Sequence, residues 1–441
     1  MADIAAPAPR ALPLLRERRF WPLFWTQFLG ALNDHVFKNA FMAILTYRLA
    51  DELGLNLDFH VLFAGALYIL PFALIAGTAG QIADGMDKAV MMRRAKAAEI
   101  ALMALAGLAF WAQSLAGLYA LLFLMGAQSA VFAPIKYAVL PSYLDRAELM
   151  AGAGLVQSAT FFAIIIGQIL GIKVALMEGG VAVVCAAVLI LAVLGWAASL
   201  YAPALPPKGA PPKPDWTFVR AVVQVVGQCR KRPDPFFAVL AIMWFWFAGA
   251  TFLTLILPIA KGTLHASEDA ALALLFAFVA GLAAGAALTG VVTRGRIDLS
   301  IPPWGALGIA AGGVLFWLAA SGYGAGLDRA GPLLTVGAFL ARPDAWGVMA
   351  AAVVMAASAG LYVAPLNALY AAAAPEEERG RFVACSNILD AGAMVFSSLF
   401  AMALLSAGLS REAVFAVVGL TGLGAAWALW RRHRRAPIRL R

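Results

Sequence analysis

The stretch Val181–Leu200 reads VAVVCAAVLILAVLGWAASL, and none of its side chains is charged. About 20 mostly apolar residues in a helix are enough to cross the hydrocarbon core of a bilayer. Segments of the same kind recur along the whole 441-residue chain, which predicts an all-α polytopic membrane protein. The twelve predicted spans are roughly 20–49, 59–83, 95–112, 116–140, 151–172, 179–201, 235–260, 269–292, 302–321, 346–370, 382–407 and 412–430.

The composition agrees with this fold class. Of all residues, 63% are hydrophobic and 13% are charged, and the mean hydropathy is +0.84. A soluble domain is about half apolar and about a quarter charged, so a soluble fold could not bury this much apolar surface. The three cysteines lack metal-site spacing, and there is no P-loop, G-x-S-x-G or H-E-x-x-H motif. We therefore expect no enzyme activity, no cofactor and no metal.

The basic residues predict the orientation in the membrane. With both termini in the cytoplasm, most of the 33 Lys and Arg residues fall on the cytoplasmic side, as the positive-inside rule requires. A basic tail could bind nucleic acid, but beside a membrane span we expect it to bind anionic membrane lipids instead. The cytoplasmic clusters, which account for the net charge of +9, are Arg16/Arg18/Arg19, Lys88/Arg93/Arg94/Lys96, Arg230/Lys231/Arg232 and Arg431 to Arg441.

The spans divide into two sets of six. In the connection between the sets, closely spaced prolines exclude a continuous helix. Apolar residues then recur at helical spacing from Trp216 to Val226, which predicts an amphipathic helix on the membrane surface. The loop 321–345 is expected outside the membrane, with no assigned role. The predicted organisation is a cytoplasmic tail at 1–19, a six-helix bundle at 20–201, a cytoplasmic linker at 202–234, a second six-helix bundle at 235–430 and a basic tail at 431–441.

Two matches between the halves indicate an internal repeat. Ala133-Pro134-Ile135-Lys136 in span four matches Ala364-Pro365-Leu366-Asn367 in span ten. In the next span of each half, Gln157 and Thr160 match Asn387 and Asp390, both pairs at the i, i+3 spacing of one helix face. Parallel repeats of six spans are typical of major-facilitator transporters. Chance similarity between apolar helices is the alternative.

Among the charged residues of the predicted spans four stand out, namely Asp34, Lys38, Lys136 and Asp390. A charge at mid-bilayer costs about 2.5–3.5 kcal/mol on insertion scales, which favours a functional role. Asp34 and Lys38 are one helical turn apart and can pair, with His35 and Asn39 on the adjoining stripe. We expect a polar site for a substrate headgroup, the alternative being structural ion pairs between helices. Asn33 points away from this face and is expected to bond a neighbouring helix.

The second half differs, because span seven carries a run of aromatic residues, Trp244, Phe245, Trp246 and Phe247. The charges therefore lie mostly in the first half. A cavity with an apolar aromatic wall opposite those charges would suit an amphiphile with a polar head and an acyl tail. Alternatively, the aromatic side chains face lipid.

The connection between spans two and three resembles the G-x-x-x-D-[RK]-x-G-[RK] loop of major facilitators at Gly80, Asp84 and Lys88. It departs from that pattern with Gly85 after the aspartate and with Asp87 in place of a glycine. The resemblance implies that Gly80, Asp84 and Lys88 belong to a cytoplasmic gate, where Asp84 helps to hold the two halves together.

Three segments resemble the bacterial lysophospholipid transporters, namely QFLGALNDHVFKN (27–39), APIKY (133–137) and VAPLNAL (363–369). The resemblance implies a flippase that moves lysophosphatidylethanolamine or lysophosphatidylglycerol inward across the bacterial inner membrane by alternating access. Many relatives are fused to acyltransferase and acyl-ACP synthetase domains. This chain is expected to contain neither, so a separate protein would re-acylate the lipid. The transporter itself is expected to be a monomer. The implied substrate site comprises Asp34, His35, Lys38, Asn39, Lys136, Tyr137, Asn367, Asn387 and Asp390.

In this hypothesis Lys136 binds the phosphate, because a compact ammonium suits an anionic oxygen. Asp34 accepts the amine or holds Lys38 in place, and Asn387 and Asp390 form the opposite wall. Two other functions fit the sequence. A proton-coupled transporter of small drugs or metabolites would use Asp34 or Asp390 as its proton carrier. A scaffold that docks an acyltransferase on its basic face would have little reason to keep four buried charges.

Overall fold

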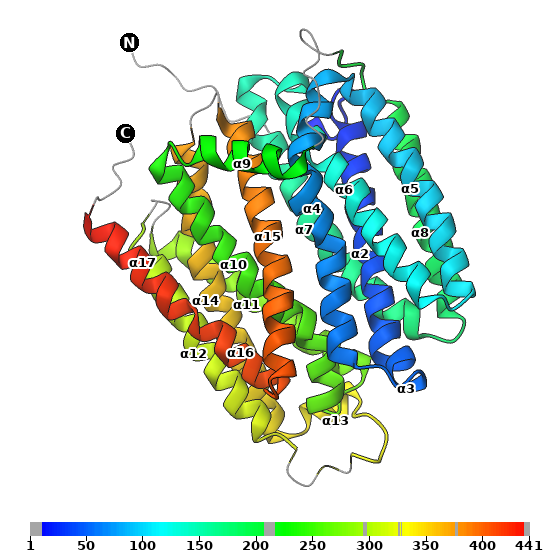
Figure 1. Ribbon diagram of the computed structural model, residues 1–441, viewed down its shortest axis with the longest axis vertical. Coiled ribbons are helices and arrows are strands. Elements are labelled where there is room, and N and C mark those ends of the chain that lie inside the picture. Colours follow the sequence, from blue (N-terminus) through cyan, green and yellow to red (C-terminus); the bar gives the residue numbers. More distant parts are fainter. Residues whose placement is uncertain are drawn as a thin grey trace. The chain divides into compact units, whose positions relative to one another are not determined.

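The computed structural model describes residues 11–206, 217–293, 298–324, 327, 329–374 and 378–435, which are helical through most of their length (Figure 1). Within these residues there is no strand, and an isolated parallel bridge joins Ala266 and Leu334. The all-α prediction is therefore confirmed. Backbone contacts divide the chain into two compact units, one of residues 1–44 and 74–222 and one of residues 45–73 and 223–441.

The first unit is built around helix α2. This helix packs along α7 and α8, while α5 packs against α6 and α8. Most side chains of α2 are buried as a result, including polar ones. The unit contains α1 (Ala11–Leu14), α2 (Trp21–Ile44), the second part of α4 (Leu57–Gly85), α5 (Lys88–Trp111), α6 (Leu115–Tyr143), α7 (Arg146–Leu176), α8 (Gly180–Leu200) and the start of α9 (Phe218–Cys229).

Two glycines bring α7 close to α2. A Cβ atom added at Gly171 would lie 2.6 Å from the carbonyl oxygen of Val36, and one at Gly167 would lie 2.6 Å from the Cβ of His35. Both distances are shorter than van der Waals contact, so any larger residue would push the helices apart. Helix α7 therefore covers the stripe of α2 that carries His35 and Asn39.

In the second unit, α14 packs against α11 and α12, α10 packs against α15, and α12 packs against α16. The unit contains η1 (Leu45–Leu49), α3 (Ala50–Glu52), the first part of α4, the rest of α9, α10 (Pro233–Pro258), η2 (Ile259–Thr263), α11 (Glu268–Val292), α12 (Ile301–Ser321), α13 (Val336–Leu340), α14 (Pro343–Ala373), α15 (Arg379–Ser406), α16 (Arg411–Leu420) and α17 (Gly422–Arg435).

The helices coincide with the predicted spans. Among the residues that the structure describes, ten helical segments are long and apolar enough to cross a membrane. Helices α2 and α5 are not among these ten, so the total of twelve spans stays a prediction. Two spans are less regular than expected. The first continues from α2 into the π-helix η1, and the last is divided at Thr421 into α16 and α17.

The predicted linker contains helix α9, whose Val219 and Val223 are exposed. Exposed valines on one face are what a helix on a membrane surface would present to lipid. Cys229, at the end of α9, is buried and donates its thiol hydrogen to the carbonyl oxygen of Arg381 at 3.7 Å. Cys229 and Cys385 are buried free thiols, and the free thiol of Cys185 is partly exposed. Trp216 lies outside the described residues.

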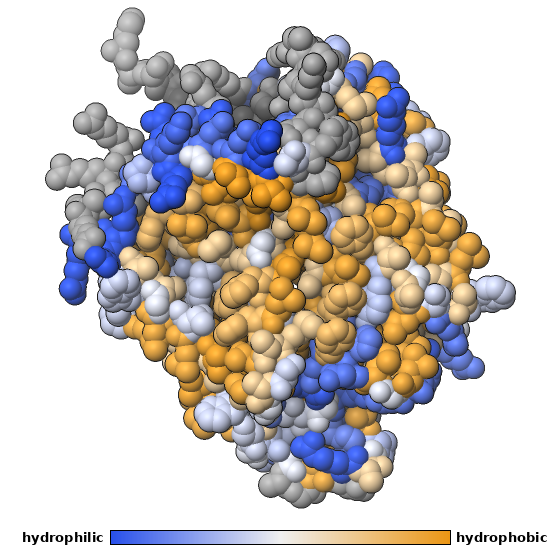
Figure 2. All heavy atoms as spheres, viewed as in Figure 1, coloured by the Kyte–Doolittle hydropathy of each residue, from blue (hydrophilic) through white to orange (hydrophobic). Residues whose placement is uncertain are grey.

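Apolar side chains cover the outer surface of the helices. Figure 2 shows hydrophobic residues gathered over α10 and α15. Phe276, Phe396 and Trp427 are each at least 60% exposed. Such a surface would associate in water, whereas hydrocarbon solvates it. The chain is a multi-pass membrane protein.

Candidate functional site

Four of the predicted site residues, Asp34, His35, Lys38 and Asn39, lie on α2. The Asp34 side chain is buried, and the Ser129 hydroxyl of α6 donates to its Oδ2 at 2.5 Å. Lys38, one turn further along α2, interacts electrostatically with the Asp34 carboxylate. Asn39 Nδ2 donates to the carbonyl oxygen of His35 at 2.8 Å. Asp34 therefore faces α6, whereas His35 and Asn39 lie where α7 packs against α2.

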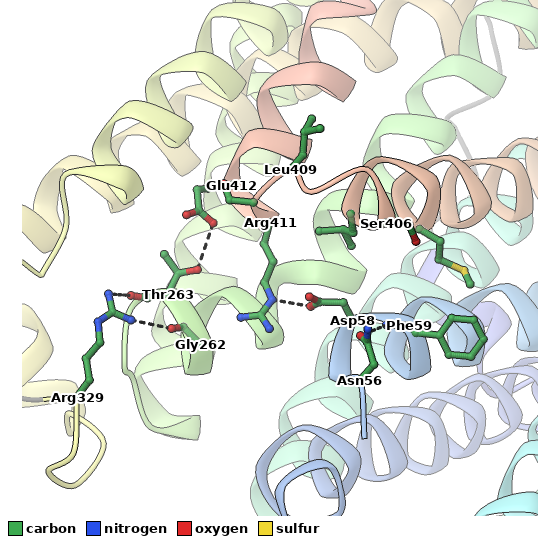
Figure 3. Close-up of a pocket in the computed structure, with 13 residues that line it drawn as sticks. Asn56, Asp58, Phe59, Gly262, Thr263, Arg329, Ser406, Leu409, Arg411 and Glu412 are labelled. Atoms are coloured by element: carbon green, nitrogen blue, oxygen red, sulfur yellow. Dashed lines mark hydrogen bonds and ion pairs between the residues drawn. The ribbon is translucent and has the colours of Figure 1, made fainter. Parts of the chain in front are cut away.

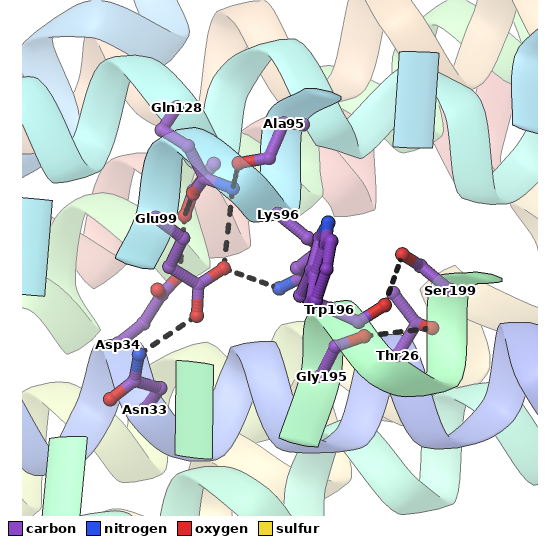
Figure 4. Close-up of polar contacts among 11 residues, drawn as sticks. Thr26, Asn33, Asp34, Ala95, Lys96, Glu99, Gln128, Gly195, Trp196 and Ser199 are labelled. Carbon is purple, nitrogen blue, oxygen red and sulfur yellow. Dashed lines mark hydrogen bonds and ion pairs between the residues drawn. The ribbon is translucent and has the colours of Figure 1, made fainter. Parts of the chain in front are cut away.

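A buried ion pair on α5 adjoins this region (Figure 4). Lys96 Nζ lies 2.5 Å from Glu99 Oε2, and the two side chains are only 3% and 1% exposed. Glu99 also accepts hydrogen bonds from Asn33 Nδ2 at 2.8 Å and from Gln128 Nε2 at 3.3 Å. Asn33 thus bonds a neighbouring helix, as its position on α2 predicts. The Glu99 carboxylate therefore joins α2, α5 and α6. Its negative charge is compensated by the Lys96 ammonium and by the two amide donors.

The position of Lys96 corrects the sequence analysis, which assigns it to a cytoplasmic basic cluster. The side chain is buried because Glu99 supplies its counter-charge and because its Nζ lies 4.9 Å from the centre of the Phe132 ring. The sequence does contain a signal for this arrangement. Lys96 and Glu99 have the i, i+3 spacing of a helical ion pair, and an apolar segment follows them.

Four predicted residues have side chains outside the part of the chain that the structure describes. The backbone of Lys136 and Tyr137 belongs to α6, and that of Gly80 and Asp84 belongs to α4. Their expected roles in substrate binding and gating stay predictions.

The third residue of the predicted gate, Lys88, begins α5. Its backbone N–H donates to the carbonyl oxygen of Leu205 at 3.2 Å. The preceding Asp87 accepts hydrogen bonds from the N–H groups of Ala89 at 2.8 Å and Val90 at 3.2 Å, and its other oxygen accepts from Leu205 N–H at 3.1 Å. Asp87 therefore caps α5 and ties it to the segment after α8. The aspartate that departs from the family pattern here thus has a structural role at the start of α5.

The remaining predicted residues belong to the second unit. Asn367 is exposed on α14, and Asn387 and Asp390 are partly exposed on α15. The Ser386 hydroxyl donates to Asp390 Oδ2 at 2.9 Å. The other carboxylate oxygen, Oδ1, is buried and accepts no hydrogen bond from the described residues. A buried carboxylate oxygen without a donor is a place where a proton or a ligand's donor group can bind.

Two aromatic residues of span seven pack within the second unit. Trp244 Nε1 donates to Thr421 Oγ1 at 2.9 Å, and the ring centre lies 4.9 Å from that of Tyr362. The Phe247 ring lies 5.9 Å from that of Phe396. Both rings therefore hold α10 against its neighbours.

An open cavity of about 520 Å³ lies in the second unit and was not predicted from the sequence (Figure 3). Its walls come from the start of α4, η2, the 321–345 loop, the end of α15 and the start of α16. These segments are far apart in the chain, which is why no local pattern indicates the cavity. The lining residues are Asn56, Asp58, Phe59, Gly262, Thr263, Arg329, Met402, Leu405, Ser406, Leu409, Ser410, Arg411 and Glu412.

Comparison with known proteins gives three findings. The sequence pattern of the Major Facilitator Superfamily matches residues 23–338. The curated "Lysophospholipid transporter LplT" of Enterobacter sp. (strain 638) is 27% identical in an alignment of 423 residues that covers 92% of this chain and 94% of that protein. The protein of the same name from Cronobacter sakazakii (strain ATCC BAA-894) is 28% identical in an alignment of 378 residues that covers 83% of this chain and 82% of that protein.

Solved structures show the same fold at lower identity. An auto-inhibited POT family peptide transporter matches with a TM-score of 0.67 at 14% identity, covering 96% of this chain and 98% of that one. A bacterial homologue of the human lysosomal transporter Spinster, in an inward-facing and unoccupied conformation, matches with a TM-score of 0.61 at 14% identity. That match covers 94% of this chain and 95% of the other. At 14% identity, the similarity to these two structures shows the fold alone.

Proposed function

Since the chain belongs to the Major Facilitator Superfamily, we propose that it is a transporter whose substrates are lysophospholipids. The predicted major-facilitator fold is confirmed by the family match and by the similarity to solved transporters. Support for the substrate class comes from relatives that carry the name lysophospholipid transporter and align with most of the chain. A single-chain phospholipid combines a charged head with an acyl tail, so its carrier needs polar groups within an apolar frame.

The polar region of α2 is the observation that carries this proposal. Asp34 and Lys38 bear opposite charges one turn apart in a membrane protein, where an unneeded charge is costly. The nearby Lys96–Glu99 pair has its own partners and is complete without a ligand. Asp34 and Lys38 are therefore the charged residues of α2 that fit a headgroup with a phosphate and an amine.

The finer assignments follow from the resemblance. We assign lysophosphatidylethanolamine and lysophosphatidylglycerol as substrates, moved inward across the bacterial inner membrane by alternating access. In this scheme Lys136 binds the phosphate, and Asp34 accepts the amine or positions Lys38. By the same resemblance, Asn387 and Asp390 are assigned as further substrate-binding residues. A separate acyltransferase then re-acylates the lipid.

The test is inward movement of fluorescent lysophosphatidylethanolamine in proteoliposomes of purified protein. The variants are Asp34→Asn and Lys38→Met, and the control is Asp298→Asn, the same chemical change in a residue outside the spans. We expect both α2 variants to lose most of the movement while the control keeps it. Insertion and unfolding temperature are measured for every variant.

Two results would overturn the proposal. One is a wild-type protein that moves neither lysophosphatidylethanolamine nor lysophosphatidylglycerol. The other is lipid movement that Asp34→Asn and Lys38→Met both leave unchanged, because these two residues would then have no part in transport.

A second function is favoured by a separate observation, the buried Oδ1 of Asp390 that accepts no hydrogen bond from described residues. A carboxyl group in this setting could carry a proton, as a proton-coupled transporter of small drugs or metabolites requires. An ionophore that dissipates the proton gradient would then abolish transport, and Asp390→Asn would remove the ionophore sensitivity. Lipid movement that continues without a gradient would exclude this alternative.

A further inference from the structure

The open cavity of the second unit contains four charged side chains of balanced sign. Arg329 and Arg411 are cationic, and Asp58 and Glu412 are anionic. Arg411 Nε donates to Asp58 Oδ1 at 2.5 Å, and the two side chains are 25% and 20% exposed. Because both charges are largely removed from water, their interactions are stronger than those of a surface pair. The cavity is thus electrically neutral but strongly polar.

Arg411 retains capacity to bind an anion. Its NH1 donates to the carbonyl oxygen of Pro258 at 3.3 Å, in addition to the Nε contact with Asp58. A guanidinium has five N–H donors, and the bonds to Asp58 and Pro258 use two of them. The described residues therefore leave further N–H donors of Arg411 for an anion. Arginine also presents its donors in a planar fork that matches two oxygens of a phosphate.

The second arginine lies at the opposite wall of the cavity. Arg329 donates to the carbonyl oxygens of Gly262 at 3.0 Å and Thr263 at 3.3 Å, as Figure 3 shows. Among the described residues, the hydrogen bonds of the Arg329 guanidinium are with these two backbone carbonyls. Glu412, nearby, accepts a hydrogen bond from the Thr263 hydroxyl at 3.2 Å. A cation and an anion therefore face the cavity from the side opposite Asp58.

The remaining wall is apolar and leads onto an exposed aromatic stripe. Met402, Leu405 and Leu409 line the cavity beside Phe59. The Phe59 ring stacks on that of Phe63, one turn along α4, with centres 5.8 Å apart. These two residues are 46% and 37% exposed. They belong to an outer surface whose other apolar side chains are also suited to hydrocarbon. An acyl chain could follow this stripe from the cavity along α4.

We infer that this cavity is a second lipid site, which binds the zwitterionic headgroup of a single-chain phospholipid, with the phosphate on Arg411 and the amine on Asp58. The inference rests on the proposed function and adds a headgroup preference to it. Neutral charge balance favours a headgroup with one positive and one negative group over one with a phosphate alone. The size of about 520 Å³ is within the range of small-ligand pockets.

Binding at this site would exchange one ion pair for two. The phosphate replaces the Asp58 carboxylate on Arg411, and the ammonium replaces the guanidinium on Asp58. Neither charge is left uncompensated at the end of the exchange, so the desolvation cost of separating the pair is offset by the ligand. The link between α4 and α16 that the Arg411–Asp58 pair supplies would be opened by the same event.

The experiment uses lysophosphatidylethanolamine with a diazirine in its acyl chain close to the glycerol. Full-length purified protein is labelled in detergent, and the labelled peptides are mapped. Binding strength is measured by competition with unlabelled lysophosphatidylethanolamine, lysophosphatidylglycerol and monoacylglycerol, which has no phosphate. The variants are Arg411→Gln, Arg411→Lys and Asp58→Asn. Matched controls are Arg342→Gln and Asp344→Asn, which alter a similar ion pair outside the cavity.

We expect labels in Phe59–Phe63 or Met402–Leu409 and about tenfold weaker competition by monoacylglycerol, since a hydrogen bond to a charged group is worth at least that factor. Arg411→Gln should weaken both phospholipids by about tenfold, and Arg411→Lys by less, because lysine keeps the charge. Asp58→Asn should weaken lysophosphatidylethanolamine and leave lysophosphatidylglycerol as tight or tighter. The controls should bind like wild type.

Absence of labels from both segments would overturn the inference. So would an Asp58→Asn variant that weakens both phospholipids equally, because a purely structural ion pair would act in that way. Labelling here without any lipid movement in proteoliposomes would leave the site standing and refute the transport proposal. Lipid movement without labelling of either segment would refute the second lipid site and leave the transport proposal standing.

Discussion

Lys96 Nζ lies 2.5 Å from Glu99 Oε2, and both side chains are almost completely buried in the first unit. Asn33 and Gln128 add two hydrogen bonds to the same carboxylate. The cost of removing these ions from water is offset only while the set is complete. The pair is therefore best understood as a structural unit next to the proposed substrate site.

Replacing one member of the Lys96–Glu99 pair should destabilise the protein by more than half of the loss that replacing both members causes. Lys96→Met or Glu99→Gln alone leaves the other charge buried and uncompensated, and we expect a loss of about 3–5 kcal/mol in the free energy of unfolding. The double variant should lose much less than the sum of the single ones. Denaturant unfolding in detergent measures the three variants, and additive losses would contradict a coupled pair.

Ser129→Ala should slow transport without unfolding the protein. The change removes the hydrogen bond to Asp34 Oδ2, and a bond to a charged group is worth about 1.5–3 kcal/mol, so we expect a rate roughly tenfold lower. Lipid movement in proteoliposomes gives the rate, and the unfolding temperature gives the stability. Ser142→Ala, an exposed position near the end of the same helix, is the control. An unchanged rate would mean that Ser129 does not position Asp34.

Gly171→Ala should be destabilising, although alanine is the better helix former by about 1 kcal/mol. The added Cβ would lie 2.6 Å from Val36 O and would separate α7 from α2. Gly154→Ala on the same helix is the matched control, because no atom lies within 4 Å of its added Cβ. The control should be neutral or stabilising. Equal unfolding temperatures for the two variants would contradict the close approach of α7 to α2 at Gly171.

Acid should weaken the link between the N-terminal segment and α7. The pKa of Glu148 is held below its ordinary 4.5 by the hydrogen bond from Asp145 N–H and by Arg19, whose NH2 lies 2.7 Å from Glu148 Oε1. A lowered pKa means that the carboxylate stabilises the fold above that ordinary value. This contribution is lost as the pH falls through the lowered pKa.

The measurement is the unfolding temperature between neutral pH and about pH 3, where carboxyl groups of this kind titrate. The wild type should lose more stability on acidification than Glu148→Gln, which has no carboxylate to protonate. Parallel curves for the two proteins would contradict this assignment.

The span positions could be predicted from the sequence because long apolar segments are a local property of the chain. Helix α8 (Gly180–Leu200), for example, differs by one residue at each end from the segment expected at 179–201. The break at Thr421 was not predictable from hydropathy, since the apolar character continues through it. The burial of Lys96 was predictable only in part, because its i, i+3 spacing to Glu99 is visible in the sequence, whereas its contact with Phe132 of α6 is not.

The candidate site was predictable in part. Asp34, Lys38, His35 and Asn39 share one helix, so their proximity follows from helical spacing alone. Ser129, which bonds Asp34, comes from a helix about 95 residues further along the chain, and no spacing rule connects the two. The cavity around Arg411 depends on even more distant segments and was outside the reach of sequence patterns.

The distribution of the cysteines has a practical consequence for mapping which side of the membrane each loop faces. Cys229 and Cys385 are buried, and Cys185 is only partly exposed, within α8. A water-soluble maleimide should therefore find few native thiols to modify. Single cysteines introduced into the loops could be read against this low background in intact cells. The twelve-span orientation can thus be determined without first removing the native thiols.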